Sequence, residues 1–282
     1  MKLAALLSLM LLTTAAAQGS GPGERRIAHP LGDAYLLQPE RCNPSCPLLI
    51  VSHSRGMSAS ESMTRPHLQR MFERFTRAGF AVLVSNDAGA RSWGQPASLM
   101  YLSQIRERAI RKFLFNGNTY TFGYSMGGLP ATLSAFRRVF PVMGVVLLDA
   151  RVNLLDAWQG SDPGRRHEIA EAYGVPVSGA LPFGADPYHD YHAPEYHALP
   201  VFVAGSPDDR TVVFAQNGEA LFLRSSTPDS QLLRLKGPHL GGSHFDDEVT
   251  SSMVTFLERL EQNGARTQPP FEAVRAAPNV RR

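Results

Sequence analysis

Short apolar runs alternate with helix-like segments along most of this chain, and this alternation limits its possible folds more than any other feature. The runs LLIVS (48–52), FAVLVS (80–85) and MGVVLL (143–148) are continuously apolar, as expected for strands buried on both faces of a sheet. Segment 65–78 carries its apolar residues at helical spacing. The sequence therefore predicts an α/β fold with a mostly parallel central sheet and helices on both faces.

The same patterns place the remaining elements after a polar, glycine-rich start. Further strands are expected at 33–37, 119–124, 201–204 and 231–235, and further helices at 99–114, 126–140, 213–224 and 246–260. Residues 150–199 break the rhythm: they are rich in Pro, Gly, Tyr and His, with a helix expected near 165–173. Because open α/β sheets bind ligands at the carboxyl ends of their strands, we expect a small cap-like insertion there, after strand 6.

The two ends of the chain differ from this central part. Residues 1–17 (MKLAALLSLMLLTTAAA) have Lys2, an apolar run too short to span a bilayer comfortably, and a small-residue cleavage pattern. They predict a signal peptide, and hence a secreted or periplasmic protein with no stable membrane span after processing. Residues 264–282 lack hydrophobic periodicity and are predicted to form a flexible tail.

The chain has two cysteines, Cys42 and Cys46, in the segment CNPSC. Export to an oxidising compartment would let them form a disulfide, which we predict. Two cysteines are too few for a disulfide scaffold or a four-thiolate zinc site.

Composition and motifs exclude several classes of function. The formal net charge is +3, and no long run of Lys or Arg occurs, so nucleic-acid binding is not expected. The glycine-rich segments match neither a phosphate loop nor a dinucleotide fingerprint, so no cofactor is implied. Three Tyr-His pairs at 188–197 match no closed zinc pattern, and no metal site is predicted. We expect them instead to form a polar, aromatic rim over the carboxyl edge of the sheet.

The segment GYSMG (123–127) matches G-x-S-x-G and lies between a predicted strand and a predicted helix. This strand–turn–helix context indicates a nucleophile elbow, a sharp turn that exposes the serine. A serine hydroxyl is a poor nucleophile at neutral pH and needs an adjacent base, which an acid orients. Ser125 is therefore the candidate nucleophile.

Candidates for the acid and the base follow Ser125 in the expected chain order. Asp208 and Asp209 lie in the turn after strand 201–204; we favour Asp208 as the acid, with Asp209 as its close rival. His239 and His244 lie in the loop after strand 231–235. We favour His239 as the base, because it lies four residues past the strand, and keep His244 as the rival base.

Acyl transfer also needs donors for the developing oxyanion. We expect the backbone N–H groups of Met126, after the serine, and Arg55, in the loop after strand 48–52, to supply them. His53 precedes the serine in the chain, so we interpret it as a residue that packs this loop.

Together these pieces resemble the serine α/β-hydrolases. The matching segments are HSRG (53–56), in place of the family's His-Gly-x-Gly, GYSMGG (123–128), Asp208 and the terminal histidine loop. NDAGARSWG (86–94) is similar to an exported bacterial esterase- or lipase-like branch. The resemblance implies an α/β-hydrolase domain over 18–263 that cleaves small-molecule or lipid-like esters through an acyl-enzyme. Ser54 departs from the family pattern, which usually has glycine there.

The leading hypothesis is a secreted serine hydrolase that cleaves carboxylic esters through a Ser-His-Asp triad. Two alternatives remain. A serine peptidase of the prolyl-oligopeptidase type would share the triad, although the chain lacks a large extra domain. A non-catalytic binding protein on a hydrolase scaffold is suggested by the unusual Ser54.

Overall fold

The computed structural model describes residues 23–267. An eight-stranded sheet forms its centre, with the spatial order β1-β2-β4-β3-β5-β6-β7-β8. Strands β3 to β8 are parallel, while β2 is antiparallel to both β1 and β4. The strands are β1 (Glu24–Ile27), β2 (Ala34–Leu37), β3 (Cys46–Ser52), β4 (Ala81–Val84), β5 (Phe115–Tyr124), β6 (Val145–Leu148), β7 (Val201–Gly205) and β8 (Gln231–Arg234). The prediction of a mostly parallel sheet is confirmed.

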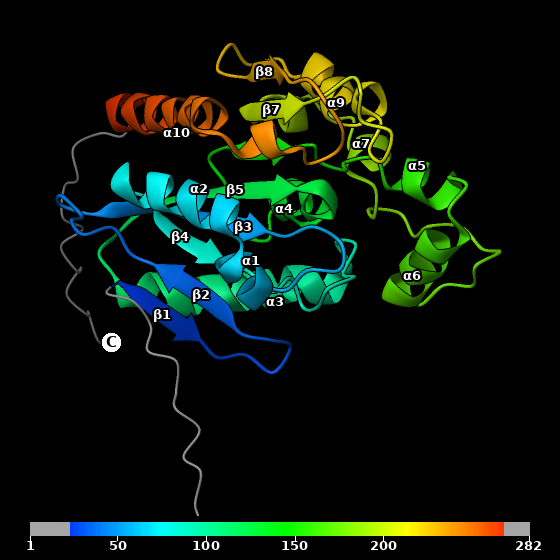
Figure 1. The fold of residues 1–282 in the computed structure, drawn as a ribbon, viewed down its shortest axis with the longest axis horizontal. Coiled ribbons are helices and arrows are strands. Elements are labelled where there is room, and N and C mark those ends of the chain that lie inside the picture. Colours follow the sequence, from blue (N-terminus) through cyan, green and yellow to red (C-terminus); the bar gives the residue numbers. More distant parts are fainter. Residues whose placement is uncertain (1–22, 268–282) are drawn as a thin grey trace, which may run out of the picture.

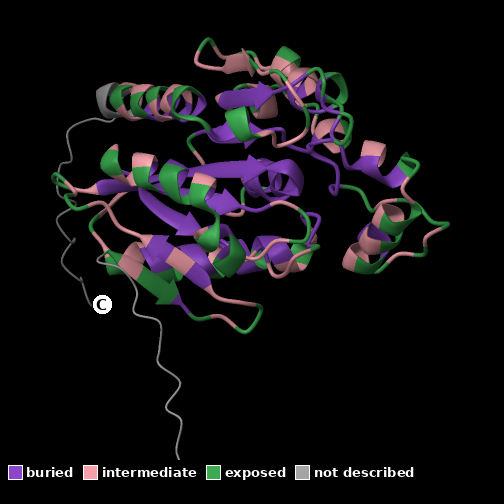
Figure 2. Ribbon diagram, viewed as in Figure 1, coloured by how far each residue is buried: buried purple, intermediate pink, exposed green. Residues whose placement is uncertain are grey.

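Helices cover both faces of this sheet (Figure 1). The alternating side chains of β3 show the division: Leu49 and Val51 pack with the first layer, and Leu48 and Ile50 with the second. The first layer contains α1 (Ala59–Thr64), α2 (Pro66–Arg77) and α10 (Asp247–Thr267). The second contains α3 (Pro96–Ala109), α4 (Gly128–Phe136) and α9 (Gly218–Arg224). Figure 2 shows the inner strands of the sheet as the buried centre between them, with the edge strands β1 and β8 less buried.

Two expectations about the ends of the chain change. Strand β1 forms in part of the polar, glycine-rich start, where no strand was predicted. It lies at the edge of the sheet, and its Arg25 and Arg26 are exposed. Helix α10 continues to Thr267, so residues 264–267 are helical and do not belong to a flexible tail. The predicted signal peptide (1–17) and residues 268–282 of the predicted tail lie outside the described residues.

The insertion at 150–199 follows β6, as predicted, and its helices α5 and α6 lie beyond the carboxyl ends of the parallel strands (Figure 1). It contains α5 (Leu154–Gln159), α6 (Pro163–Tyr173), α7 (Pro187–Asp190) and α8 (Pro194–His197). Helix α6 begins after Asp162, whose side chain accepts a hydrogen bond from the Arg165 amide at 3.2 Å. Trp93, Met126 and Trp158 belong to the apolar cluster that joins α5 and α6 to the sheet domain.

The Tyr-His segment does not form the expected rim. Tyr191 and Tyr196 pack against Phe136 of α4, with ring centroids 5.4 and 5.2 Å away. The Arg224 guanidinium, on α9, stacks 3.5 Å from the Tyr188 ring centroid. These rings fill the space between the insertion and the sheet's helices, because burying aromatic area there stabilises the fold.

The predicted disulfide is present: Cys42 and Cys46 are bonded, with Cα atoms 5.0 Å apart. It closes the loop that leads into β3. Among residues 23–267, none of the helices has the length and apolar character needed to cross a bilayer.

Candidate active site

Ser125 lies at the turn between β5 and α4, in the middle of the sheet, and its backbone has φ +53°. This left-handed conformation is rare for a residue with a side chain and is typical of a nucleophile elbow. The neighbouring glycines allow the turn to close. A Cβ on Gly123 would lie 2.3 Å from the Gly127 carbonyl oxygen, and one on Gly127 would lie 2.1 Å from that of Ser52. Glycine is therefore required at both positions, because any side chain would collide with neighbouring backbone atoms.

A hydrogen-bonded chain runs from Ser125 through His239 to Asp209. Ser125 Oγ lies 2.8 Å from His239 Nε2, and His239 Nδ1 lies 2.6 Å from Asp209 Oδ2. The histidine comes from the loop after β8 and the aspartate from the turn after β7. The carboxyl ends of parallel strands meet at one edge of the sheet, which brings the three residues together across more than 110 positions of sequence.

The structure corrects the choice between the two adjacent aspartates. Asp209 points inward with a side chain that is 1% exposed, whereas Asp208 is exposed and accepts a hydrogen bond from the Gly237 amide at 3.1 Å. Consecutive side chains in this turn point in different directions, so only one of the two can reach His239. The favoured acid, Asp208, is the one that does not.

Two backbone amides hold the Asp209 carboxylate in place. Its Oδ1 accepts from Thr211 N at 2.7 Å and Val212 N at 2.9 Å, while Oδ2 faces His239. Burial raises the pKa of this carboxyl, but the hydrogen bonds from His239, Val212 and Thr211 outweigh it and hold the pKa below its usual range. Asp209 is therefore a carboxylate at neutral pH and acts as a hydrogen-bond acceptor for the imidazole.

His244, the rival base, is turned away from the serine. It is fully buried; its Nδ1 lies 2.6 Å from Asp149 Oδ2 and its Nε2 lies 3.0 Å from the Lys236 carbonyl oxygen. Asp149 Oδ2 also accepts a hydrogen bond from the amide of Leu240 at 2.7 Å. The pair Asp149–His244 thus braces both ends of the loop that carries His239.

Sequence reasoning missed Asp149, which immediately follows β6 with φ +44°. The signal was available, since a carboxylate directly after a buried parallel strand lies at the ligand-binding edge of the sheet. Single oxygen or nitrogen atoms of Asp149, Asp209 and His239 lie within 4.8 Å of one another, a spacing that a cation could also use. Both ring nitrogens of His239 already face Ser125 and Asp209, so the group fits a triad with a supporting carboxylate.

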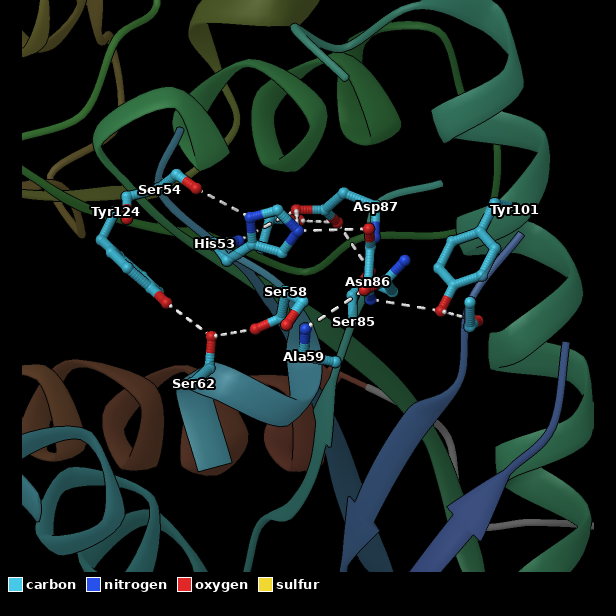
Figure 3. Close-up of polar contacts among 12 residues, drawn as sticks. His53, Ser54, Ser58, Ala59, Ser62, Ser85, Asn86, Asp87, Tyr101 and Tyr124 are labelled. Carbon is cyan, nitrogen blue, oxygen red and sulfur yellow. Dashed lines mark hydrogen bonds and ion pairs between the residues drawn. The ribbon is translucent and has the colours of Figure 1, made fainter. Parts of the chain in front are cut away.

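The loop after β3 rests on a buried network around His53 and Asp87 (Figure 3). His53 Nδ1 lies 2.8 Å from the Ser54 carbonyl oxygen, and its Nε2 lies 3.1 Å from that of Asn86. The His53 amide donates to Asp87 Oδ2 at 2.9 Å. His53 therefore packs and orients the loop that carries Ser54 and Arg55, as its position before the serine suggested.

Asp87 is the centre of this network and was not identified from the sequence. Its Oδ1 accepts hydrogen bonds from the hydroxyls of Ser52 at 2.9 Å and Ser85 at 2.6 Å, at the ends of β3 and β4. Nearby, Ser62 of α1 hydrogen-bonds Tyr124 at 3.0 Å, beneath the elbow (Figure 3). The contacts of Ser52 and Tyr124 fix the ends of β3 and β5, the strands that lead to the predicted oxyanion donors Arg55 and Met126.

A cavity of about 220 Å³ opens beside the serine. The predicted oxyanion residues Arg55 and Met126 both line it, together with the nucleophile and His239. The Arg55 side chain reaches α6, where Nε and Nη2 lie 2.7 and 2.8 Å from the two oxygens of Glu168. The remaining lining residues are Ser54, Trp93, Arg151, Arg165, Thr211, Val212 and Leu240.

The Arg55–Glu168 pair joins the oxyanion loop to the insertion. Burial raises the pKa of the Glu168 carboxyl, but the hydrogen bond and charge of Arg55, with the charge of Arg91, hold it below its usual range. The hydrogen bond that Arg55 donates to Glu168 in turn raises the pKa of Arg55. Trp93 lines the cavity and also packs under the insertion.

Comparison with solved structures places this arrangement in a known class of fold. The protein Est1E from Butyrivibrio proteoclasticus matches with a TM-score of 0.65 and 18% identity, over 86% of this chain and 100% of that one. The fluorophosphonate-binding serine hydrolase FphF from Staphylococcus aureus matches with a TM-score of 0.64 and 14% identity, over 84% and 99%. Carboxyl esterase 2 from the mycorrhizal fungus Tuber melanosporum gives 0.61 and 16%, over 88% and 89%.

The chain therefore has the α/β-hydrolase fold. No protein-family model matches its sequence. No curated protein sequence matches it either. At these identities the likeness is one of architecture, and the assignment of chemistry depends on the residues at the site.

Proposed function

We propose that this protein is a serine hydrolase that cleaves carboxylic esters through an acyl-enzyme. The observation that carries the proposal is the continuous chain Ser125–His239–Asp209, with distances of 2.8 and 2.6 Å, on a strained elbow beside an open cavity. Nucleophile, base and orienting acid together form the triad that activates a serine. Two of the matching solved structures are called a serine hydrolase and a carboxyl esterase, which supports the same chemistry.

In the acylation step, Ser125 Oγ attacks the ester carbonyl carbon while His239 Nε2 takes the hydroxyl proton. Asp209 keeps the Nδ1 proton of His239 directed toward itself and stabilises the imidazolium that forms. The C–O bond of the tetrahedral intermediate breaks, and His239 returns the proton to the departing alcohol. Water then attacks the acyl-enzyme by the same route and releases the acid.

The oxyanion formed in both steps would lie against the backbone N–H groups of Met126 and Arg55. Met126 follows the nucleophile at the start of the turn, and the Arg55 loop is held by the His53–Asp87 network and by Glu168. Donors fixed in advance lower the barrier because they need no rearrangement as charge develops; each contributes about 3 kcal/mol. The Ser54 that replaces the usual glycine stands in this same loop and lines the cavity.

We also propose that the protein is exported, as residues 1–17 predict. The Cys42–Cys46 disulfide supports this, because such bonds persist in oxidising compartments. Sequencing of the mature protein's N-terminus tests it: cleavage after Ala17 would leave Gln18 first, whereas an intact Met1 would contradict export by this route.

The hydrolysis of p-nitrophenyl esters from acetate to palmitate tests the catalytic proposal. We expect turnover by the native protein, its loss in Ser125→Ala, and an optimum at short acyl chains because the cavity is small. Turnover that persists in Ser125→Ala would contradict the proposed nucleophile. Hydrolysis of the matching p-nitroanilides but not of the esters would favour the peptidase alternative, and binding without turnover would favour the binding-protein alternative.

A further inference from the structure

The cavity beside Ser125 is unusually rich in arginine. Three arginines line it: Arg55 from the loop after β3, Arg151 from the loop after β6, and Arg165 from α6. A pocket for a purely apolar acyl chain would be lined mainly by hydrophobic side chains. The charges of these arginines therefore need an explanation, either in neighbouring carboxylates or in the ligand.

Two of the three arginines are fully engaged by protein groups. Arg55 forms a bidentate ion pair with Glu168. Arg151 is buried; it donates to Asp156 Oδ2 at 2.6 Å and to the Thr211 carbonyl oxygen at 2.7 Å. Both therefore have structural partners, and neither needs a ligand to balance its charge.

Arg165 is different. Its side chain is 19% exposed, and its one ion pair within residues 23–267 is with Asp162, at 3.7 Å, too long for a hydrogen bond. Asp162 also faces Arg55 at 3.5 Å, so its charge is shared. A half-buried guanidinium whose donors have no acceptor at hydrogen-bonding distance in the described chain is unusual, because such groups normally satisfy several donors.

The ion pairs beside the cavity include more arginines than carboxylates. Around the insertion side of the cavity, four guanidinium groups (Arg55, Arg91, Arg151 and Arg165) share three carboxylates (Asp156, Asp162 and Glu168). Arg151 and Arg165 line the same cavity. Burial lowers the pKa of Arg151 and Asp156 raises it; the Arg165 charge lowers it by repulsion, and the Asp209 charge raises it. An anion bound between the two arginines would relieve this repulsion.

We infer that the cavity accepts a small ester that carries a carboxylate, with Arg165 as the counter-ion for that group. This inference rests on the proposed esterase function and narrows its substrate class. A guanidinium suits this role, since its planar fork matches a carboxylate. The cavity of about 220 Å³ limits the carboxylate-bearing part to a few carbon atoms.

Two pairs of esters, each an anionic ester beside a neutral one of similar size, test the inference and locate the anion. For the acyl side, the p-nitrophenyl monoester of succinic acid is compared with p-nitrophenyl butyrate. For the alcohol side, 4-acetoxybenzoate is compared with its methyl ester. We expect the native protein to favour the anionic member of one pair, and Arg165→Gln to lower that kcat/KM ratio about tenfold or more, as for the loss of a charge-assisted hydrogen bond.

Arg166→Gln is the matched control. It removes the same charge from the next residue of α6, whose guanidinium stacks 4.7 Å from the Trp158 ring centroid and does not line the cavity. A ratio that falls equally in both variants would indicate a general field effect and overturn the assignment of Arg165. A ratio unchanged by Arg165→Gln in both ester pairs would overturn the inference, while hydrolysis dependent on Ser125 would leave the proposed function standing.

A binding measurement separates the inference from catalysis. Calorimetric titration of succinate into Ser125→Ala, and into the double variant with Arg165→Gln, needs no turnover. We expect succinate to bind Ser125→Ala, with an affinity that falls about tenfold in the double variant. The affinity should also fall with added salt. Equal affinity of the two proteins for succinate, or no binding to either, would contradict the anion site even if no ester were hydrolysed.

Discussion

The Asp149 carboxylate lies 2.6 Å from His244 Nδ1, and the same oxygen accepts the amide hydrogen of Leu240, the residue after His239. One buried carboxylate at the end of β6 thus holds the loop that presents His239, the proposed base. His244, the rival base in the sequence analysis, therefore acts as a positioning residue for His239.

Asp149→Asn should therefore lower both stability and kcat. The substitution keeps the shape of the side chain but removes the charge that the His244 imidazole and the Leu240 amide both face. We expect the free energy of unfolding to fall by about 2 kcal/mol, the range for a hydrogen bond to a charged group. Urea denaturation measures this loss. Because His239 loses its support, kcat should fall more than KM rises; unchanged kinetics in a destabilised variant would contradict the positioning role.

The two adjacent aspartates should differ sharply in their effect on catalysis. Asp209→Asn should lower kcat about 1,000- to 10,000-fold, because the imidazole loses the acceptor that fixes its tautomer and stabilises its charge. Asp208→Asn, one position away and exposed, should retain activity within about threefold, as expected for a surface change. Steady-state kinetics on one ester is sufficient. Equal losses in both variants would contradict the assignment of Asp209.

Gly127→Ala should prevent the elbow from closing. The new Cβ would lie 2.1 Å from the Ser52 carbonyl oxygen and 2.8 Å from that of His53, in backbone that cannot move without disturbing β3. We expect a loss of stability above about 3 kcal/mol, as for other severe steric conflicts. Gly242→Ala is the control, since a Cβ there meets no atom within 4 Å and the backbone does not have positive φ. Similar melting temperatures for the two variants would argue against a steric requirement.

The contribution of the Asp209 carboxylate to the free energy of unfolding should disappear in acid. Hydrogen bonds hold the folded-state pKa of this carboxyl below its unfolded value of about 3.9, so the carboxylate stabilises the native state above that value. This contribution is lost as the pH falls through the lowered folded-state pKa. The difference in unfolding free energy between native protein and Asp209→Asn should therefore shrink from pH 5 to pH 2. A difference that grows on acidification would contradict the direction of the pKa shift.

The elements that the sequence predicted well are those with a strong local pattern. The apolar runs became β3, β4 and β6, and the helix pattern at 65–78 became α2. Ser125 could be identified because its glycines and its strand–helix context leave a visible motif. His239 could be favoured because it lies only four residues after the predicted strand at 231–235.

The remaining errors have a common physical origin, because a sequence fixes chain position but not side-chain direction. Asp208 and Asp209 are equivalent by position, and only the rotation of the turn after β7 decides which faces inward. Asp149 offers only its position after a buried strand, because its partners Leu240 and His244 lie more than 90 residues away. Arg165 shows no motif, because distant segments form the cavity that it lines. Strand β1 has no apolar signature because it lies at an exposed edge.

The most direct test of the account is the reaction of the folded protein with a fluorophosphonate, followed by mass spectrometry of its peptides. The triad geometry predicts one label per chain, on Ser125, with labelling slowed strongly in His239→Gln and absent in Ser125→Ala. No labelling of the folded native protein, or a label on any other residue that persists in Ser125→Ala, would contradict the claim that Ser125 is an activated nucleophile.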